Sequence, residues 1–351
     1  MGAKSAVESV LFLRHPEGQW LVGWGQMDRM VTEPLDHPAF FLPDFFSQDP
    51  KPWWRPEHFA ELSTAEILQR WPEISQVDMA LTSVWNWQDP EQVHFAKEFT
   101  DLLTRIEQGE LRKAVPMVMS QALRLPTAQE KFQWWARAMA APPSWMAYGG
   151  WWGEEGLIGL TPEILFYSSD GWIKTMALAG TAPEPGPSLF SSEKDQREHQ
   201  WVVDDIGQQL SFFGIVQKTD TQEWKLGRLK HLRTDLAVEA QTDFMTLVKL
   251  LHPTPALGVA PRAAGLGFLA ESVFAKKRRR FGAPFGVNIP GRLALCGVAI
   301  RGLQWHEGKT WLSSGCGVVA GSQLEKEWQE LKLKRAVVAE QFGVLNSRVP
   351  S

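Results

Sequence analysis

The sequence has 351 residues, of which 44% are hydrophobic and 22% charged, as is usual for a globular protein with a large core. The formal net charge is −4, so no global positive field exists and nucleic acid is not the expected partner. No apolar run reaches the roughly 18–20 residues that span a bilayer, so no membrane association is expected. The only cysteines, Cys296 and Cys316, cannot build a disulfide framework. These features fit a reducing, cytoplasmic location.

The first part of the chain predicts β-hairpins followed by helices. Residues 9–13 and 19–25 have the composition of paired strands, and residues 33–57 are rich in Pro, Phe and Asp, which indicates an irregular loop. Apolar residues recur at helical spacing over residues 92–107. A turn and a strand are expected at 110–120, and a second amphipathic helix at 126–142.

The remaining elements follow without a βαβ rhythm. Strands are expected at 145–153, 164–168, 172–178, 214–218 and 223–232, a hairpin at 292–304 and 310–314, and helices at 194–213, 235–251 and 323–342. A Pro/Gly/Ser loop covers 182–192, and five consecutive basic residues at 276–280 are interpreted as a solvated loop. Groups of strands that alternate with long helices predict an α+β protein with largely antiparallel sheets.

Two of the expected helices carry carboxylates at informative positions. Glu327, Glu330 and Lys334 are spaced i, i+3 and i+7, so they share one face of the last helix. That helix directly follows a Gly-rich stretch, and a helix N-terminus offers N–H groups to an anion. Glu198 lies beyond the first turn of its own helix, where the helix dipole explains it less well. Each pattern alone is also typical of a solvated helix face, but carboxylates from two helices could share a hard cation such as Mg²⁺.

Several short segments are more specific as an ordered set than singly. They are Leu160-Thr161-Pro162-Glu163, Ala177-Leu178-Ala179-Gly180-Thr181, Glu198-His199, Lys230-His231-Leu232, His252-Pro253-Thr254-Pro255-Ala256, Arg301, Gly315-Cys316-Gly317, and Glu327-Trp328-Gln329-Glu330 with Lys334. Their order and spacing, over about residues 108–342, resemble the chorismate-binding family. That family includes isochorismate synthases, salicylate synthases, and the large subunits of anthranilate and aminodeoxychorismate synthases.

The resemblance implies a fold and a domain organisation. The expected fold is α+β, with large antiparallel sheets packed as a two-lobed sandwich and helices outside. Residues 1–351 would form a single chorismate-binding domain, in which 1–107 are a variable β-rich part and 108–342 carry the catalytic motifs.

The resemblance also implies a role for each matching residue. Lys113, in the segment Glu110-Leu111-Arg112-Lys113-Ala114-Val115, would be the general base, and Glu163 the general acid. Glu198 and Glu330 would hold Mg²⁺, with Glu327 close by. The substrate pocket would be lined by Gly180, Thr181, His231 and Ala256, and the substrate carboxylates would be held by Arg301, Lys334 and the amides around Gly315 and Gly317.

This set of groups suits the isomerisation of chorismate, a small dianion. Water adds at C2 and the C4 hydroxyl leaves, so the reaction needs a base for the water and an acid for a poor leaving group. Mg²⁺ on the ring carboxylate would polarise the conjugated diene. An arginine suits a bidentate grip on the other carboxylate.

Three positions depart from the family pattern. Phe281-Gly282-Ala283-Pro284 stands where the family usually has Tyr-Ala-Gly-Pro, so a phenolic hydroxyl is missing. The lysine strand ends in Met119-Ser120, where an arginine is common. Cys316 replaces the usual alanine between two glycines. None of these changes removes a proposed catalytic group.

The sequence therefore predicts an Mg²⁺-dependent isochorismate synthase, of the menaquinone or siderophore pathway, with no obligatory protein partner. Anthranilate and aminodeoxychorismate synthases are alternatives, but they usually read Pro-Ile-Ala-Gly-Thr-Arg-Pro where this chain reads Ala-Leu-Ala-Gly-Thr-Ala-Pro. Salicylate synthases tend to carry a threonine near the position of Ala256. An inactive binding protein is the remote alternative, and retention of the acid, base and metal residues argues against it.

Overall fold

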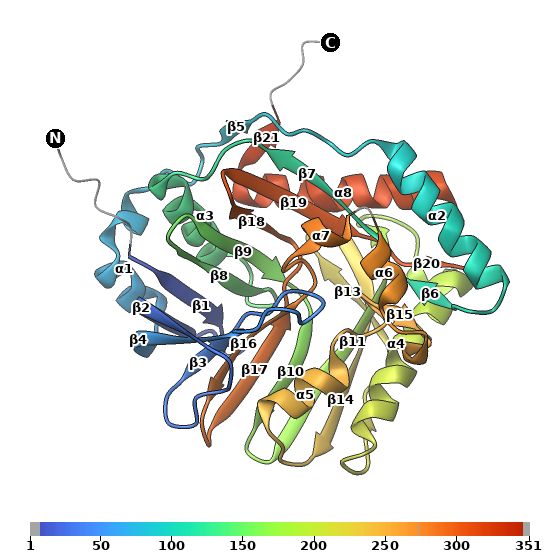
Figure 1. The fold of residues 1–351 in the computed structure, drawn as a ribbon, viewed down its shortest axis with the longest axis horizontal. Coiled ribbons are helices and arrows are strands. Elements are labelled where there is room, and N and C mark those ends of the chain that lie inside the picture. The colour runs from blue at the N-terminus through green and yellow to red at the C-terminus, as the bar shows by residue number, and fades with distance from the viewer. Residues whose placement is uncertain (1–7, 273, 347–351) are drawn as a thin grey trace.

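The computed structural model of the protein describes residues 8–272 and 274–346. Sixteen of its strands form one continuous sheet, in which neighbouring strands are antiparallel. Helices lie on the outside of the folded sheet (Figure 1). The α+β prediction is confirmed, although the large sheets expected from the sequence are joined edge to edge into one.

The strands of the N-terminal half are β1 (Val10–Arg14), β2 (Trp20–Met30), β3 (Ala39–Phe41), β4 (Trp53–Leu62), β5 (Ser83–Trp85), β6 (Lys113–Ala114), β7 (Met117–Ala122), β8 (Met146–Trp152), β9 (Glu155–Thr161), β10 (Ile164–Ser169) and β11 (Trp172–Pro183). Those of the C-terminal half are β12 (Gln217–Lys218), β13 (Gln222–Leu226), β14 (Leu229–Glu239), β15 (Val259–Ala260), β16 (Pro284–Ile289), β17 (Leu293–Val298), β18 (Gly302–His306), β19 (Lys309–Gly315), β20 (Val318–Val319) and β21 (Val344–Asn346).

The helices are α1 (Thr64–Arg70), α2 (Gln92–Glu107), α3 (Ala128–Ala140), α4 (Glu193–Leu210), α5 (Phe244–Leu251), α6 (Gly267–Glu271), α7 (Ala275–Arg278) and α8 (Leu324–Phe342). The bounds of α2, α3, α4 and α8 confirm the corresponding predictions to within a few residues. Side-chain caps begin several of them: Thr127 caps α3 and Ser192 caps α4, each by accepting a backbone N–H of the first turn.

The order of strands in the large sheet is β12-β14-β11-β10-β17-β16-β3-β4-β2-β1-β8-β9-β18-β19-β7, with β13 also paired to β14. The N-terminal strands β1 to β4 lie in the middle of this order, so they join the two groups of later strands. A separate three-stranded sheet has the order β15-β6-β20, and β5 pairs with β21 in parallel.

The sheet folds so that its two halves pack face to face. Leu11 and Leu13 of β1 lie in an inner core with Phe285 and Val287 of β16, whereas Val10 and its alternating neighbours face a different cluster. Residues two apart on a strand point to the same side, so each strand contributes to an inner and an outer core. This explains why many strands read as nearly continuous hydrophobic runs.

Helices close the outer face of each half. On one side α3 and α8 pack against β1, β8 and β18, through a cluster rich in tryptophan that includes Trp134, Trp135 and Trp305. On the other side α4 and α5 cover β10, β11, β14 and β17. The resulting arrangement is helix, sheet half, sheet half, helix, with the active-site candidates near one end (Figure 1).

Several secondary-structure predictions were wrong in part. The expected strand at 223–232 is divided by a turn at Gly227-Arg228 into β13 and β14, and the strand expected at 214–218 begins only at Gln217. The expected loop at 33–57 contains β3 and the start of β4, because Phe40, Phe41 and Trp53 pack into the cores on either side. The expected helix at 235–251 begins only at Phe244. Residues up to 239 continue β14, because Leu236 and Val238 alternate with polar residues at the strand period. The expected strand at 292–304 is split into β17 and β18 around Arg301.

The interpretation of residues 276–280 as a solvated loop is also wrong for Arg278. Its side chain is only 2% exposed and its guanidinium stacks 3.4 Å from the ring centroid of Phe45. Lys277, in contrast, is exposed. A run of charged residues indicates an exposed segment only where its side chains can reach water. Arg278 cannot, because it packs against Phe45 in the interior.

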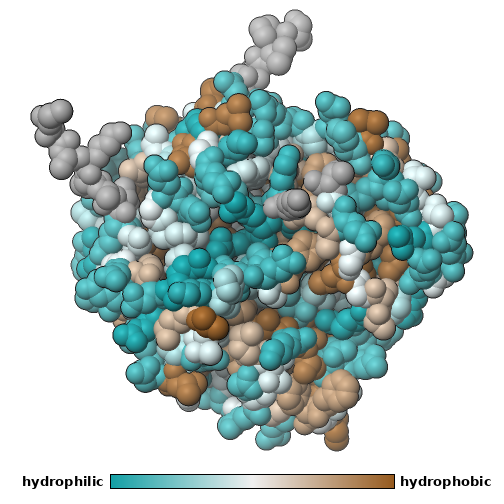
Figure 2. Space-filling view, viewed as in Figure 1, coloured by the Kyte–Doolittle hydropathy of each residue, from teal (hydrophilic) through white to brown (hydrophobic). Residues whose placement is uncertain are grey.

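Among the residues that the structure describes, no helix combines the length and apolar character needed to cross a bilayer. Figure 2 shows a largely hydrophilic face on which hydrophobic residues gather in small groups.

Candidate active site

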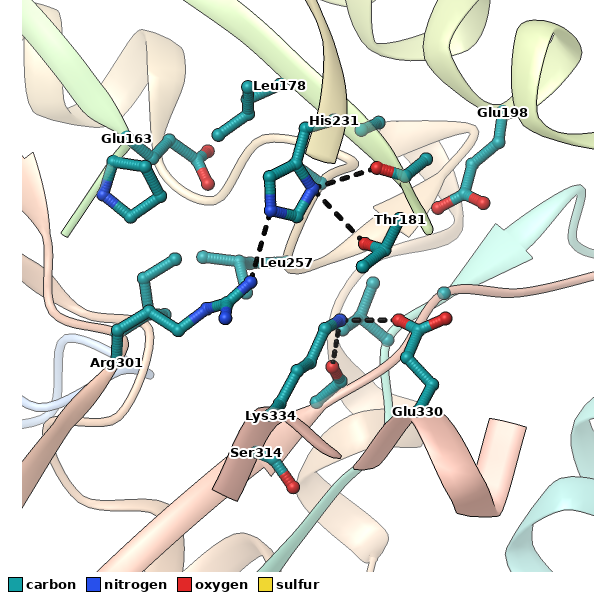
Figure 3. A pocket seen from close by; sticks show the side chains of 18 of the residues that line it. Glu163, Leu178, Thr181, Glu198, His231, Leu257, Arg301, Ser314, Glu330 and Lys334 are labelled. Carbon is teal, nitrogen blue, oxygen red and sulfur yellow. Dashed lines mark hydrogen bonds and ion pairs between the residues drawn. The ribbon is translucent and has the colours of Figure 1, made fainter. Parts of the chain in front are cut away.

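A pocket lies where the two ends of the large sheet approach one another. On one side it is lined by Ser313 to Gly315 of β19, and on the other by the end of β11 and by His231 of β14. These strands stand near opposite ends of the strand order. The pocket encloses about 790 Å³ with its mouth included. In Figure 3, Glu163 and Arg301 lie on one side of the pocket and Glu198 and Glu330 on the other.

Every site residue predicted from the sequence lines this pocket. The set is Lys113, Glu163, Gly180, Thr181, Glu198, His231, Ala256, Arg301, Gly315, Gly317, Glu327, Glu330 and Lys334. They come from strands, loops and helices spread over more than two hundred residues of sequence. The structure therefore brings the predicted set together, while the role of each residue stays a prediction.

The three-stranded sheet fixes the position of Lys113. In β6 it pairs with Ala260 of β15 on one side and with Val319 of β20 on the other. Its side chain is 1% exposed, and its Nζ lies 2.8 Å from Glu198 Oε1 on α4. Burial alone would raise the pKa of Glu198, but the Lys113 ammonium outweighs burial and the net pKa is lowered.

Glycine at 317 makes room for this ion pair. A Cβ at Gly317 would lie 2.3 Å from Glu198 Oε1 and 3.0 Å from Lys113 Cε. At Gly315, two residues earlier, the nearest atoms would be 3.2 Å away or more. Gly317 is therefore required by close approach, whereas a Cβ at Gly315 would need only a small adjustment of its neighbours.

The other two carboxylates of the predicted metal set also meet lysines. Glu327 accepts from Lys194 Nζ at 2.6 Å, and Glu330 lies 2.5 Å from Lys334 Nζ. Burial and the neighbouring charge of Glu330 raise the pKa of Glu327. The sequence reasoning missed Lys194, although it stands four residues before Glu198 on the same face of α4.

The residues present have the right chemistry for Mg²⁺ without forming a finished cage. Within residues 8–272 and 274–346, no three Asp, Glu, His or Cys side chains are close enough to make a ready-made metal site. However, Glu198, Glu327 and Glu330 line one wall, where burial and the charge of Glu330 raise the pKa of Glu327. Mg²⁺ prefers such oxygen ligands and often takes only one or two protein carboxylates, together with waters and substrate.

Glu163 sits in a contrasting environment. It is buried in the turn between β9 and β10, where its N–H donates to Thr161 Oγ1 and its carboxyl accepts from Thr254 Oγ1 at 3.4 Å. Burial raises the pKa of Glu163 to about 7, although Lys113 nearby acts in the opposite direction. Thr254 belongs to the segment His252-Pro253-Thr254-Pro255-Ala256, but the sequence predicts no role for this threonine.

His231 is held as a neutral ring of defined tautomer. Its Nδ1 lies 2.9 Å from the Gly180 carbonyl, which only accepts, so Nδ1 carries the proton. Its Nε2 lies 3.2 Å from Arg301 Nη2, which only donates, so Nε2 accepts. Burial, with the charges of Arg301 and Lys334, lowers the pKa of His231 to about 3.

Arg301 has an open donor in this setting. One guanidinium nitrogen meets His231, while Nη1 is buried with no partner among the described residues. The backbone of Arg301 has a positive φ of 56°, in a region that costs a residue with a side chain about 1–3 kcal/mol. A strained backbone that aims an unpaired buried donor into a pocket suits an anionic ligand.

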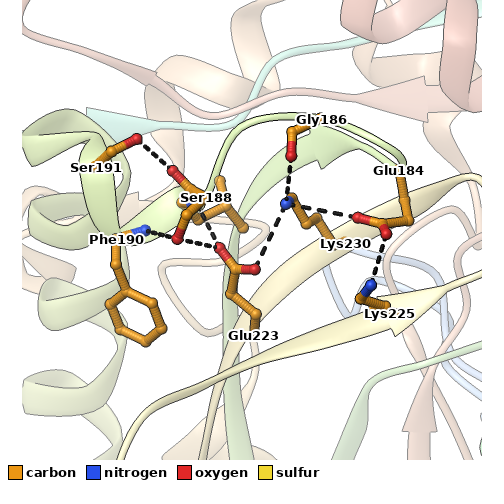
Figure 4. A network of polar contacts seen from close by, with 9 residues as sticks. Glu184, Gly186, Ser188, Phe190, Ser191, Glu223, Lys225 and Lys230 are labelled. Carbon is orange, nitrogen blue, oxygen red and sulfur yellow. Dashed lines mark hydrogen bonds and ion pairs between the residues drawn. The ribbon is translucent and has the colours of Figure 1, made fainter.

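A polar network anchors the loop between β11 and α4 (Figure 4). Lys230 donates to the Gly186 carbonyl at 3.0 Å and lies 3.5 Å from both Glu184 and Glu223. Glu223 in turn accepts from Ser188 Oγ at 2.8 Å. This loop joins Thr181 to the start of α4, and both line the pocket. The network therefore fixes the position of β11 relative to α4.

Comparison with known proteins places the chain in a family. The family model described as chorismate binding enzyme matches residues 56–343. The chain belongs to the chorismate-binding enzyme family. The match begins before residue 108 and includes most of β4, whereas β1, β2 and β3 lie outside it.

Relatives of two activities are similar to this chain. A salicylate biosynthesis isochorismate synthase of Pseudomonas aeruginosa is 31% identical over 207 residues, which is 55% of this chain and 43% of that protein. An anthranilate synthase component 1 of Acetivibrio thermocellus is 27% identical over 230 residues, 61% of this chain and 46% of that protein. The chain thus spans about half the length of the curated relatives that it matches.

The fold is shared with solved structures. MenF, the menaquinone-specific isochorismate synthase from Escherichia coli, superposes with a TM-score of 0.74 at 19% identity, covering 97% of this chain and 90% of that one. The predicted family fold is therefore confirmed over nearly the whole chain.

The close approach at Gly317 yields a prediction. Gly317→Ala forces Glu198 and Lys113 apart, so the free energy of unfolding should fall by about 1–3 kcal/mol, as is typical of overpacked sites. Urea unfolding followed by tryptophan fluorescence measures this. Gly315→Ala is the matched control and should lose clearly less stability. Equal losses in the two variants would show that the ion pair does not depend on the glycine.

Proposed function

We propose that the protein is an Mg²⁺-dependent isochorismate synthase, which converts chorismate to isochorismate. The observation that carries the proposal is the pairing of opposite proton-transfer groups in one pocket. Glu163 is a carboxyl that burial keeps protonated up to a pH of about 7, and Lys113 is a buried amine lining the same cavity. A reaction that adds water at one carbon and expels a hydroxyl at another needs such a pair.

The cationic side chains of the pocket suit a dianion. Arg301 directs its unpartnered Nη1 toward the ligand, and Lys334 stands on α8 beside the Gly315 carbonyl, which accepts from it at 2.8 Å. The neutral state of His231 leaves the arginine as the local positive charge. We assign Arg301 and Lys334 to the substrate carboxylates, with Gly180, Thr181, His231 and Ala256 as the wall against the ring.

Lys113 would activate the attacking water in its neutral amine form, which requires that the ammonium paired with Glu198 first lose its proton, and Glu163 would protonate the departing hydroxyl. The ion pair with Glu198 orients Lys113, and Thr254 orients the Glu163 carboxyl. Mg²⁺ held by Glu198 and Glu330, with Glu327 close by, would supply Lewis-acid polarisation of the ring carboxylate. Burial excludes bulk water from Glu163, so the proton that it carries is transferred to the leaving group and not exchanged with solvent.

Ala256 supports isochorismate as the released product. Conversion to salicylate requires that the enolpyruvyl ether bond break and that a ring hydrogen move to the methylene carbon, so that pyruvate leaves. Ala256 presents only a methyl group to the pocket. It offers neither the hydroxyl nor the bulk that would push the enolpyruvyl tail toward that hydrogen.

The first prediction identifies the product. Incubation with chorismate and Mg²⁺ should give isochorismate by chromatography, without stoichiometric pyruvate in a lactate-dehydrogenase-coupled assay. The same mixture with ammonium should give no anthranilate or aminodeoxychorismate. Fluorescent salicylate with equimolar pyruvate would make the protein a salicylate synthase, and an amino product would make it an amine-adding member of the family.

The second prediction concerns the metal. Glu198→Gln and Glu330→Gln should each nearly abolish turnover and weaken Mg²⁺ binding measured by isothermal titration calorimetry, because each removes a charged oxygen ligand. Circular dichroism checks that the fold survives. Glu340→Gln, which alters an exposed carboxylate of α8 outside the pocket, serves as control. Full activity in excess EDTA would contradict the assignment.

The third prediction concerns the acid and the base. Lys113→Ala and Glu163→Gln should each lower kcat by about 10²–10⁴. In the wild-type enzyme kcat should fall as pH rises through about 7, because Glu163 then loses the proton it must donate. Glu163 also contributes most to the free energy of unfolding at a pH below the ordinary pKa of a glutamate, and this contribution is lost as the pH rises to about 7. If the kcat of both Lys113→Ala and Glu163→Gln stays within about threefold of the wild-type value, both role assignments are wrong.

A further inference from the structure

Arg278 is a buried cation that the proposed chemistry does not use. Its Nη2 donates to the Leu257 carbonyl at 3.0 Å, its Nη1 to the Val115 carbonyl at 3.4 Å, and its Nε to the Phe281 carbonyl at 3.2 Å. All three of those residues line the pocket. One guanidinium therefore contacts three separate walls of the pocket from behind.

The position of these carbonyls is specific. The segment of Lys113 pairs with β15 through Arg112 N–H to the Ala260 carbonyl at 2.6 Å and Val115 N–H to the Gly258 carbonyl at 3.0 Å. Beyond that point, among the described residues, no backbone N–H donates to the next two carbonyls, those of Val115 and Leu257. Arg278 bridges both, so it extends the ladder past its end with side-chain donors.

The two bridged chains carry different parts of the site. Val115 follows Lys113 by two residues, and Leu257 directly follows Ala256. The distance between those two segments therefore sets the distance between Lys113, the proposed base, and Ala256, which lies on the wall that faces the enolpyruvyl tail. A planar, rigid fork fixes such a spacing better than an ammonium at the end of a flexible stem.

Burial of this charge needs a reason. No carboxylate of the described residues lies within ion-pair distance of Arg278; Glu98 is the nearest acidic influence, and burial lowers the pKa of the guanidinium to about 9. A buried cation without a paired anion is costly, so it persists where its hydrogen bonds matter. The face of Phe45 covers it on the side away from the carbonyls.

We propose that Arg278 is a positioning residue that sets the distance between the Lys113 strand and the Ala256 loop, and thereby keeps the reaction at isochorismate. The product part of this inference rests on the proposed function. The positioning part does not, because it concerns only two segments of backbone.

The test compares Arg278→Met, Arg278→Lys and Arg279→Met. Methionine is unbranched, of similar length, and removes every donor. Lysine keeps the charge but lacks the planar fork of donors. Arg279 is a neighbouring arginine that pairs with Glu307 at the surface. Hydrogen exchange by mass spectrometry is measured on peptides covering residues 112–115 and 257–260. Exchange there should rise at least tenfold in Arg278→Met, less in Arg278→Lys, and not in Arg279→Met or in the β8–β9 hairpin.

The second readout is the ratio of pyruvate to isochorismate formed from chorismate. This ratio does not depend on the fraction of enzyme that is folded, so a merely structural role would not change it. It should rise about tenfold in Arg278→Met, because a misplacement of about 1 Å can change a rate by roughly 10²-fold. It should rise less in Arg278→Lys and stay at the wild-type value in Arg279→Met.

The outcomes separate the two proposals. Unchanged exchange at 112–115 and 257–260 would overturn the positioning role, whatever the enzyme makes. Raised exchange with an unchanged product ratio would overturn the control of the product. A wild-type protein that forms no isochorismate contradicts the proposed function and, with it, the product part, while hydrogen exchange still decides the positioning part. If Arg278→Met does not fold, Arg278→Lys carries the same comparison.

Discussion

Lys113 and Glu198 bring opposite charges to 2.8 Å, with side chains that are only 1% and 10% exposed. Neither charge could stay there alone, because desolvation of an unpaired ion costs several kcal/mol. The pair joins the small central sheet to α4, and hence joins the two halves of the large sheet across the pocket. Gly317 has no side chain at the point where this contact would otherwise be blocked.

The rest of the pocket repeats the same electrostatic arrangement. Each of the acidic residues on the metal side has a lysine partner, from α4 for Glu327 and from its own helix for Glu330. On the opposite side the titratable groups are neutral or unpaired: Glu163 holds its proton, His231 is uncharged and Arg301 has a free donor. The wall suited to a cation thus also carries Lys113, and the other wall carries Glu163 and an arginine suited to an anion.

Membership in the chorismate-binding enzyme family fits this division, and the family includes relatives that are named for different products. Since the fold is common to them, the product must be decided by the few side chains that touch the substrate and by what holds those side chains in place. In this protein Ala256 and the backbone beside it are the candidates, and Arg278 supports that backbone from behind.

The sequence by itself determined the family, the α+β class and a set of thirteen residues that the structure brings to one pocket, because these depend on short segments whose order along the chain is itself the signal. Helices such as α2 and α8 were also readable, since a long amphipathic period is a local property. Tertiary structure alone decided the rest. The lysine partners of the carboxylates, the tautomer of His231 and the raised pKa of Glu163 depend on which strands meet in space. The burial of Arg278 shows the limit most clearly: five consecutive basic residues indicate solvent, and only the packing of the chain against Phe45, Val115 and Leu257 takes one of them into the interior.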